Sequence, residues 1–140
     1  MRKIDPKLAR LKSSPTFAQL GNRRLKALAP FTDDIEVPAG TVLMEQDSRP
    51  HELEVIVEGS ADILVGGKKV GEVGPGAVLG EMALLNRSTR SATVVTTSAS
   101  KLIVISARAF EGLMEKYPEI AKDLKAMAAA RAGENALFEE

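Results

Sequence analysis

The chain has 140 residues, which suits one domain, and its 19 basic residues balance its 19 acidic residues. This balance excludes a general electrostatic attraction to nucleic acid or to an anionic membrane, so any bound anion must be held by a local site. The sequence has no cysteine, a single histidine (His51) and no apolar run near roughly 18 residues, which excludes thiolate or clustered metal sites and membrane-spanning helices.

Residues 7–30 predict a lead-in of short helices. Leu8 and Leu11 lie at helical spacing, and a second apolar pattern follows the helix-start signal Ser13-Ser14-Pro15. Pro30 ends this pattern, because proline cannot continue a helix.

Residues 34–106 change to the two-residue period of β-strands. Leu53, Val55 and Val57 alternate with glutamates, a pattern typical of a strand with one buried face. Short apolar segments separated by glycine and proline turns at intervals of roughly ten residues predict a small antiparallel β-roll or jelly-roll barrel. The expected strands lie within residues 35–37, 42–44, 53–57, 61–65, 68–70, 91–95 and 102–105.

The last part of the chain returns to a helical pattern. Apolar residues from Phe110 onward lie at helical spacing, and Pro118 marks a break. We expect a helical pair over residues 107–132, ended by Gly133, and a tail over residues 133–140. The whole chain is therefore predicted to be a single domain, mainly β with flanking α-helices.

The apolar stripe of this helical pair allows two interpretations. It packs against the protein's own barrel, which is the ordinary role of such a stripe, or it forms a seam between two copies of the chain. The stripe consists of Leu113, Tyr117, Ile120 and Leu124.

Residues 79–93 contain the parts of an anion site. Gly80 lets a ligand approach the backbone closely, and the helix formers Met82 to Leu85 allow one helical turn whose start offers unpaired N–H groups. The guanidinium of Arg90 can meet two phosphate oxygens at once. Glu81, an acceptor when ionised, suits a ribose hydroxyl. Together these residues describe a ligand with one sugar and one phosphate.

A surface ion pair is the alternative for two of these side chains. Spacing alone would allow Glu81 and Arg90 to be a solvated pair that contributes at most about 1 kcal/mol. The neighbouring glycine and apolar turn favour the anion site instead. Arg87 lies in the expected loop before Arg90, and we interpret it as a solvated side chain.

The run from Gly80 to Leu85, followed by Arg90 to Val94, resembles the phosphate-binding cassette of the cyclic nucleotide-binding domain family. This family includes the catabolite activator proteins and the regulatory subunits of cAMP-dependent protein kinase. Residues 37–47 and 55–61 are similar to the family's early strands and glycine turn, and the resemblance covers residues 17–124. It implies a β-roll with N-terminal helices, a short cassette helix and C-terminal helices.

The resemblance also implies a role for each cassette residue. Glu81 would accept from the ribose 2′-OH, Arg90 would pair with the exocyclic phosphate oxygens, and Ser91 would add a hydroxyl donor. Backbone N–H groups at the start of the cassette would line the sugar and the phosphate. The expected ligand-binding residues are Gly80, Glu81, Met82, Ala83, Leu84, Arg90, Ser91, Ala92 and Thr93.

Two positions depart from the family's pattern. Leu79 stands where an aromatic residue is usual, and Gln46 replaces a common glycine in the turn after Met44. Neither change removes a polar group that faces the ligand, so we interpret both as changes of shape.

Recognition of the base is less defined. Thr93 and Val73 either face a purine or are plain strand packing. A serine after Arg90, where members selective for cGMP often carry threonine, favours cAMP as the ligand, with cGMP as the alternative. In the family a residue of the C-terminal helix often covers the base, and the candidates here are Met127, Arg131, Leu137 and Phe138.

These features predict a non-enzymatic, cytoplasmic, stand-alone receptor domain without a cofactor. The sequence has no Gly-x-Ser-x-Gly elbow, Cys/His pair or Walker loop. The segment after Val104 is too short for a winged helix and has no basic recognition face, so no nucleic-acid or membrane partner is expected. A protein effector or a second copy would bind the C-terminal helices. The alternative is a domain that keeps the fold, binds no nucleotide and docks a protein partner.

Overall fold

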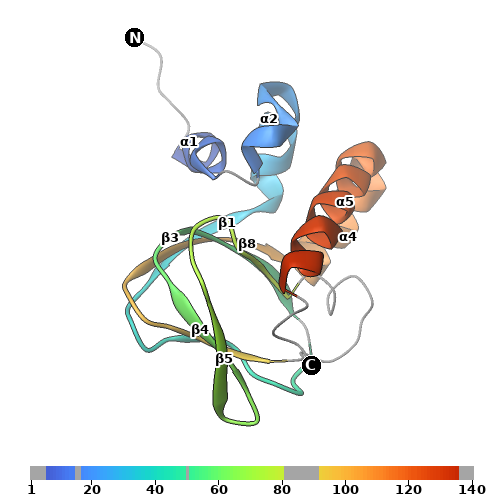
Figure 1. The fold of residues 1–140 in the computed structure, drawn as a ribbon. Coiled ribbons are helices and arrows are strands. Elements are labelled where there is room, and N and C mark those ends of the chain that lie inside the picture. Colours follow the sequence, from blue (N-terminus) through green and yellow to red (C-terminus); the bar gives the residue numbers. More distant parts are fainter. Residues whose placement is uncertain (1–5, 15–16, 50, 81–91, 136–140) are drawn as a thin grey trace.

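The computed structural model describes residues 6–14, 17–49, 51–80 and 92–135 (Figure 1). The N-terminal part contains two helices, α1 (Pro6–Ser13) and α2 (Asn22–Leu28), and two 3₁₀ turns, η1 (Phe17–Leu20) and η2 (Ala29–Phe31). The expected helical lead-in is therefore confirmed. Proline is tolerated in the first turn of η2, because the N–H group that it lacks would have no partner there.

Two four-stranded antiparallel sheets form the expected β-roll, and the described strands remain two separate sheets and do not close into a barrel. The first sheet has the order β1-β8-β3-β6 and the second the order β2-β7-β4-β5. The strands of the first sheet are β1 (Asp33–Val37), β3 (Glu52–Glu58), β6 (Val78–Leu79) and β8 (Ser100–Ser106). Those of the second are β2 (Val42–Met44), β4 (Ala61–Val65), β5 (Lys68–Val73) and β7 (Thr93–Thr96).

The strands differ from the expected ones at two places. β5 continues through Gly71 to Val73, beyond the strand expected within residues 68–70, and the register between β4 and β5 shifts beside Ile63. A glycine inside a strand is typical of such an irregularity. The short strand β6 was not expected, because two residues are too few to show a period.

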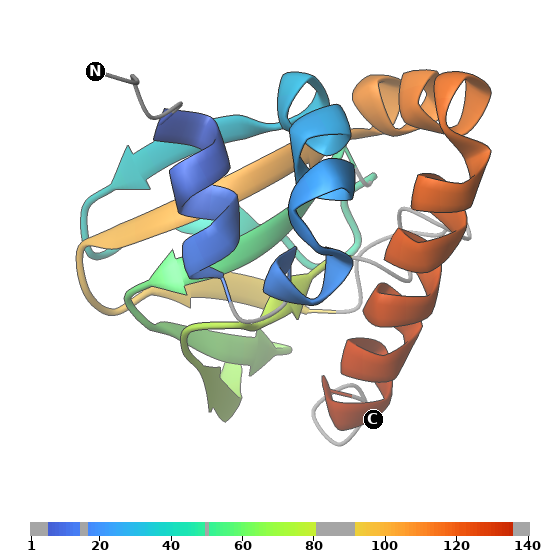
Figure 2. The ribbon, with the colours of Figure 1, turned by 90° about the horizontal axis from the view of Figure 1, so that it is seen from above.

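The protein has two apolar cores, one on each face of the first sheet. The inner core fills the space between the sheets, and the outer core lies between the first sheet and the helices, which cover its outer face (Figure 2). Leu113, Ile120 and Leu124 are buried in the outer core, and Tyr117 packs against it. The expected stripe therefore packs within its own chain, as its first interpretation predicted.

Strand β3 lies between these cores, and the prediction that only one of its faces is buried was wrong. Val55 and Val57 belong to the outer core, whereas Ile56 belongs to the inner one. Glu54 alternates to the same inner face and is only 1% exposed. An alternation of glutamate with apolar residues does not reveal a second buried face, because the second sheet that covers it is distant in sequence.

The C-terminal helices are α4 (Ala107–Lys116) and α5 (Pro118–Asn135), which confirms the expected helix, kink and helix. Ser106 caps α4 by accepting a hydrogen bond from the N–H group of Ala109 at 3.0 Å. Gly133 does not end α5, since the alanine-rich turns before it offset the roughly 1 kcal/mol that a glycine costs in a helix. Among the described helices, none has the length and apolar character needed to cross a membrane.

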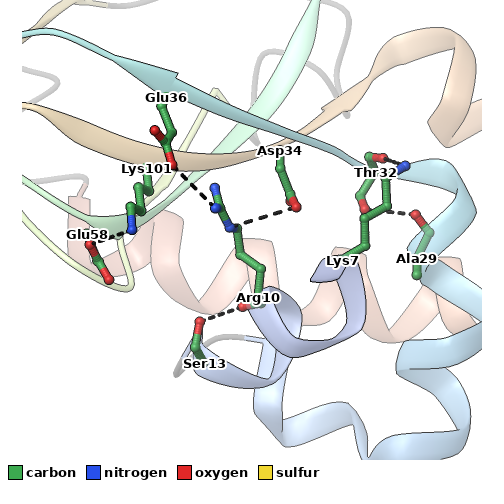
Figure 3. Close-up of polar contacts among 9 residues, drawn as sticks. All are labelled: Lys7, Arg10, Ser13, Ala29, Thr32, Asp34, Glu36, Glu58 and Lys101. Carbon is green, nitrogen blue, oxygen red and sulfur yellow. Dashed lines mark hydrogen bonds and ion pairs between the residues drawn. The ribbon is translucent and has the colours of Figure 1, made fainter. Parts of the chain in front are cut away.

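Polar contacts fasten α1 to the first sheet (Figure 3). The Lys7 ammonium donates to the carbonyl of Thr32 at 2.7 Å. The Arg10 guanidinium lies 3.8 Å from the Asp34 carboxylate and 3.6 Å from that of Glu36. These contacts fix where the helical layer meets the edge strand β1, although each partly exposed pair contributes at most about 1 kcal/mol.

We predict that Gly59→Ala destabilises the protein more than Gly40→Ala does. Both glycines have positive φ, 111° and 83°. A Cβ at Gly59 would lie 2.8 Å from the Cα of Ser100, whereas one at Gly40 would meet nothing within 4 Å. The close approach adds an overpacking cost of about 1–3 kcal/mol. Urea unfolding gives the free energy of unfolding of both variants. Equal decreases in the two variants would contradict the close-packing explanation.

Candidate functional site

The candidate site is bounded by two described ends, one in each sheet. Gly80 follows β6 in the first sheet, and Ala92 precedes β7 in the second. Leu79 and Ala92 are both buried in the inner core. The two described ends therefore belong to different sheets, and each adjoins the interior of the roll.

Gly80 has a backbone conformation that favours glycine. Its φ is 79°, in the left-handed region where a side chain is strained. The residue is half-buried and directly follows the buried Leu79. The structure thus supplies a physical reason for glycine at the first position of the predicted cassette.

At the other end of the segment, Ala92 and Thr93 have different surroundings. Ala92 is 6% exposed and packs in the inner core with Val94. Thr93 is half-buried, and its Oγ1 accepts a hydrogen bond from the backbone N–H of Gln46 at 2.9 Å. A hydroxyl that accepts one bond can still donate another.

The other predicted ligand contacts lie outside the described residues. They are Glu81, Met82, Ala83, Leu84, Arg90 and Ser91. The candidate lids Leu137 and Phe138 also lie outside, and α5 places the backbone of Met127 and Arg131 but their side chains are not described. Val73 pairs with Ala61 and packs against the inner core, which fits its interpretation as strand packing.

Glu54 is a residue near the site that the sequence analysis missed. It pairs in register with Leu79 on one side and Val104 on the other, and both neighbours belong to the inner core. Its buried carboxylate is therefore close in the sheet to the strand that leads into Gly80. The only signal in the sequence was a glutamate inside an apolar strand, and this signal does not distinguish a buried face from a solvated one.

A charged cluster on the β4–β5 hairpin is separate from the site's chemistry. Lys69 donates a hydrogen bond to Glu72 and lies 3.3 Å from the Asp62 carboxylate. The bond to Glu72, followed by that to Asp62, raises the pKa of Lys69, and the bond from Lys69 lowers the pKa of Glu72. Lys69 and Glu72 are exposed and Asp62 is half-buried, as in surface pairs that support a hairpin. Among the described side chains, no acidic or histidine cluster suits a metal ion.

We predict that Gly80→Ala lowers the free energy of unfolding by about 1–3 kcal/mol, the cost of a left-handed conformation for a residue with a side chain. Gly74→Ala is the matched control, because Gly74 has no positive φ and a Cβ there would lie 3.8 Å from the carbonyl oxygen of Gly59. Chemical unfolding without ligand provides the measurement. A Gly80 variant as stable as the Gly74 variant would show that position 80 does not need this conformation.

The sequence and fold match those of known proteins. A family model for the cyclic nucleotide-binding domain matches residues 34–117, more than half of the chain. A cyclic nucleotide-gated potassium channel of Mesorhizobium japonicum is 33% identical over 119 residues, covering 85% of this chain and 33% of the channel. A Pycsar effector protein of Xanthomonas perforans is 33% identical over 101 residues, covering 71% of this chain and 33% of the effector.

A solved structure shows the same fold. The regulatory domain of Toxoplasma gondii PKA, crystallised with cAMP, superimposes with a TM-score of 0.65 at 26% identity, covering 79% of this chain and 46% of that chain. This chain spans about a third of the length of the channel and of the effector. The similarity to these two proteins therefore concerns one of their domains.

Proposed function

The chain belongs to the cyclic nucleotide-binding domain family, and from this premise we propose that it binds one cyclic nucleotide in the segment between Gly80 and Thr93. The observation that carries the proposal is the combination of the cassette sequence with its two anchored ends. Gly80 has a left-handed backbone conformation that favours glycine, and Ala92 is buried at the other end of the segment.

In this proposal different cassette residues contact different parts of the ligand. Arg90 pairs with the exocyclic phosphate oxygens through a charge-assisted hydrogen bond, and Glu81 accepts from the ribose 2′-OH. Ser91 donates its hydroxyl. The backbone N–H groups of Gly80, Met82, Ala83 and Leu84 line the sugar and the phosphate. The site needs no metal or cofactor, because the guanidinium supplies the positive charge.

We further propose that cAMP is preferred over cGMP. A serine follows Arg90, where threonine is frequent in members of the family that select cGMP. The PKA regulatory domain with the same fold was solved with cAMP. Both observations support an adenine base, and a direct comparison of the two nucleotides tests the preference.

The proposed role is regulatory rather than catalytic, in a cytoplasmic receptor. The one histidine, His51, is exposed, and its backbone carbonyl accepts a hydrogen bond from the N–H of Ala107 at 2.8 Å. We assign no role in binding or catalysis to this exposed imidazole.

Signalling would pass through the C-terminal helices. Helix α5 contacts β6, the strand that leads directly into Gly80, and Arg24 of α2 forms an ion pair with Asp123 of α5. A shift of the cassette on binding can therefore be transmitted to α5 through packed elements. This would act as a switch only if the ligand binds one helix arrangement better than the other. A protein effector or a second copy of the chain would then bind to one arrangement of the helices in preference to the other.

The competing function is a protein-docking module that keeps the fold but binds no nucleotide. Isothermal titration with cAMP and cGMP, with AMP as the non-cyclic control, separates the two functions. Saturable binding of a cyclic form near one per chain, with AMP much weaker, supports the proposal and identifies the preferred base. Neither heat nor a thermal shift with millimolar cyclic nucleotide would contradict it and favour the docking module.

Arg90→Ala should weaken cyclic nucleotide binding roughly tenfold to a hundredfold, since a hydrogen bond to a charged group contributes about 1.5–3 kcal/mol. Arg87→Ala removes the same charge from the same segment and is the matched control. We expect a change of less than about twofold, because we interpret Arg87 as a solvated side chain and such charges contribute little. Titration of both variants gives the dissociation constants. Equal losses in the two variants would show that only net charge matters and would contradict the role of Arg90.

A further inference from the structure

Gln46 joins three parts of the second sheet that are distant in sequence. Its backbone N–H donates to Thr93 Oγ1 at 2.9 Å, at the first residue of β7. Its side-chain Oε1 accepts from the N–H of Gly66 at 2.8 Å, in the turn between β4 and β5. One residue thus bonds both to the start of β7 and to a neighbouring hairpin.

The turn that carries Gln46 is itself well held. Ser48 donates from its backbone N–H and from its hydroxyl to the carbonyl of Glu45, at 3.2 Å and 2.6 Å. The left-handed residue of this turn is Asp47, with a φ of 69°. Position 46 therefore does not need glycine here, which leaves it free to carry a side chain that makes a contact.

These contacts act on the point where the proposed cassette ends. Thr93 is three residues after Arg90 and two after Ser91. An extended chain spans at most about 3.3–3.6 Å per residue, so the position of Thr93 restricts the space that these two residues can reach. A fixed Thr93 lowers the conformational freedom that the cassette would lose on binding.

We propose that Gln46 is a positioning residue for the nucleotide site. Its side-chain amide, anchored on Gly66, holds its own backbone N–H against Thr93 and so orders the end of the cassette before the ligand arrives. This inference rests on the proposed function. It assigns a role in binding to a residue that the sequence analysis interpreted as a change of shape.

Two substitutions of equal length test the role of the Oε1 acceptor. Gln46→Met keeps the length of the side chain but removes the acceptor, whereas Gln46→Glu keeps an oxygen that can accept from Gly66. We expect Gln46→Met to weaken cAMP binding by about twofold to tenfold, mainly through faster dissociation, since a neutral hydrogen bond has a modest net effect. Gln46→Glu should stay within about twofold of the wild type at physiological salt, where exposed charges are screened.

Ser48→Ala is the matched control, because it removes a side-chain hydrogen bond of the same turn that reaches neither Gly66 nor Thr93. The measurements are the dissociation constant and dissociation rate of cAMP, together with urea unfolding of each variant without ligand. Binding is measured well below the melting temperature of every variant, so that a less stable variant is still folded when its affinity is compared with that of the wild type.

The outcomes separate this inference from the proposed function. Weaker binding by Gln46→Met, with Gln46→Glu and Ser48→Ala close to the wild type, supports the inference. Unchanged binding by Gln46→Met, or equal weakening in all three variants, overturns it while the proposed function stands. A wild-type protein that binds no cyclic nucleotide overturns both.

Discussion

The pairing of β3 with β8 is the interaction on which the rest of the structure depends. These two strands lie in the middle of the first sheet and pair from Glu52 with Ser106 to Ile56 with Leu102. Their side chains alternate between two cores, so one pair of strands supports both the helices outside and the second sheet inside. Hydrophobic burial on both faces gives this pair its importance, because each face removes apolar surface from water. Gly59 permits a close backbone approach to Ser100, just beyond the register shift between Ile56 and Glu58.

Much of this fold could be predicted from the sequence, because the relevant signals are local. Helical spacing, strand alternation and the break at Pro118 are properties of neighbouring residues, and they predicted the order of helices and strands. The burial of Glu54 could not be predicted, because it depends on a second sheet that covers the inner face of β3. Strand β6 also depends on tertiary pairing, since two residues have no period of their own. The end of α5 depended on a balance between one glycine and the alanines before it.

The candidate site, like the fold, could be predicted only in part from the sequence. The glycine, the acidic residue and the arginine of the cassette form a local motif, so the sequence alone pointed to a sugar and a phosphate. The contacts of Gln46 form no such motif, because Thr93 is 47 residues away from it and Gly66 is 20 residues away. A sequence shows that position 46 departs from a family pattern, but only a structure shows which groups the new side chain meets. Departures from a pattern are therefore informative places to look for contacts between distant segments.

The outer core is built from both halves of the chain, and this has a consequence for the order in which the protein is made. Leu25 and Leu28 of α2 are buried in the same core as residues of α4 and α5, and the Arg24–Asp123 ion pair joins residues 99 positions apart. At a synthesis rate of roughly 5–20 residues per second, roughly five to twenty seconds pass between the synthesis of α2 and that of the α5 residues that share its core. During that time their apolar faces are open to other nascent chains and to chaperones. The outer core of this fold is therefore completed only after α5 has been synthesised.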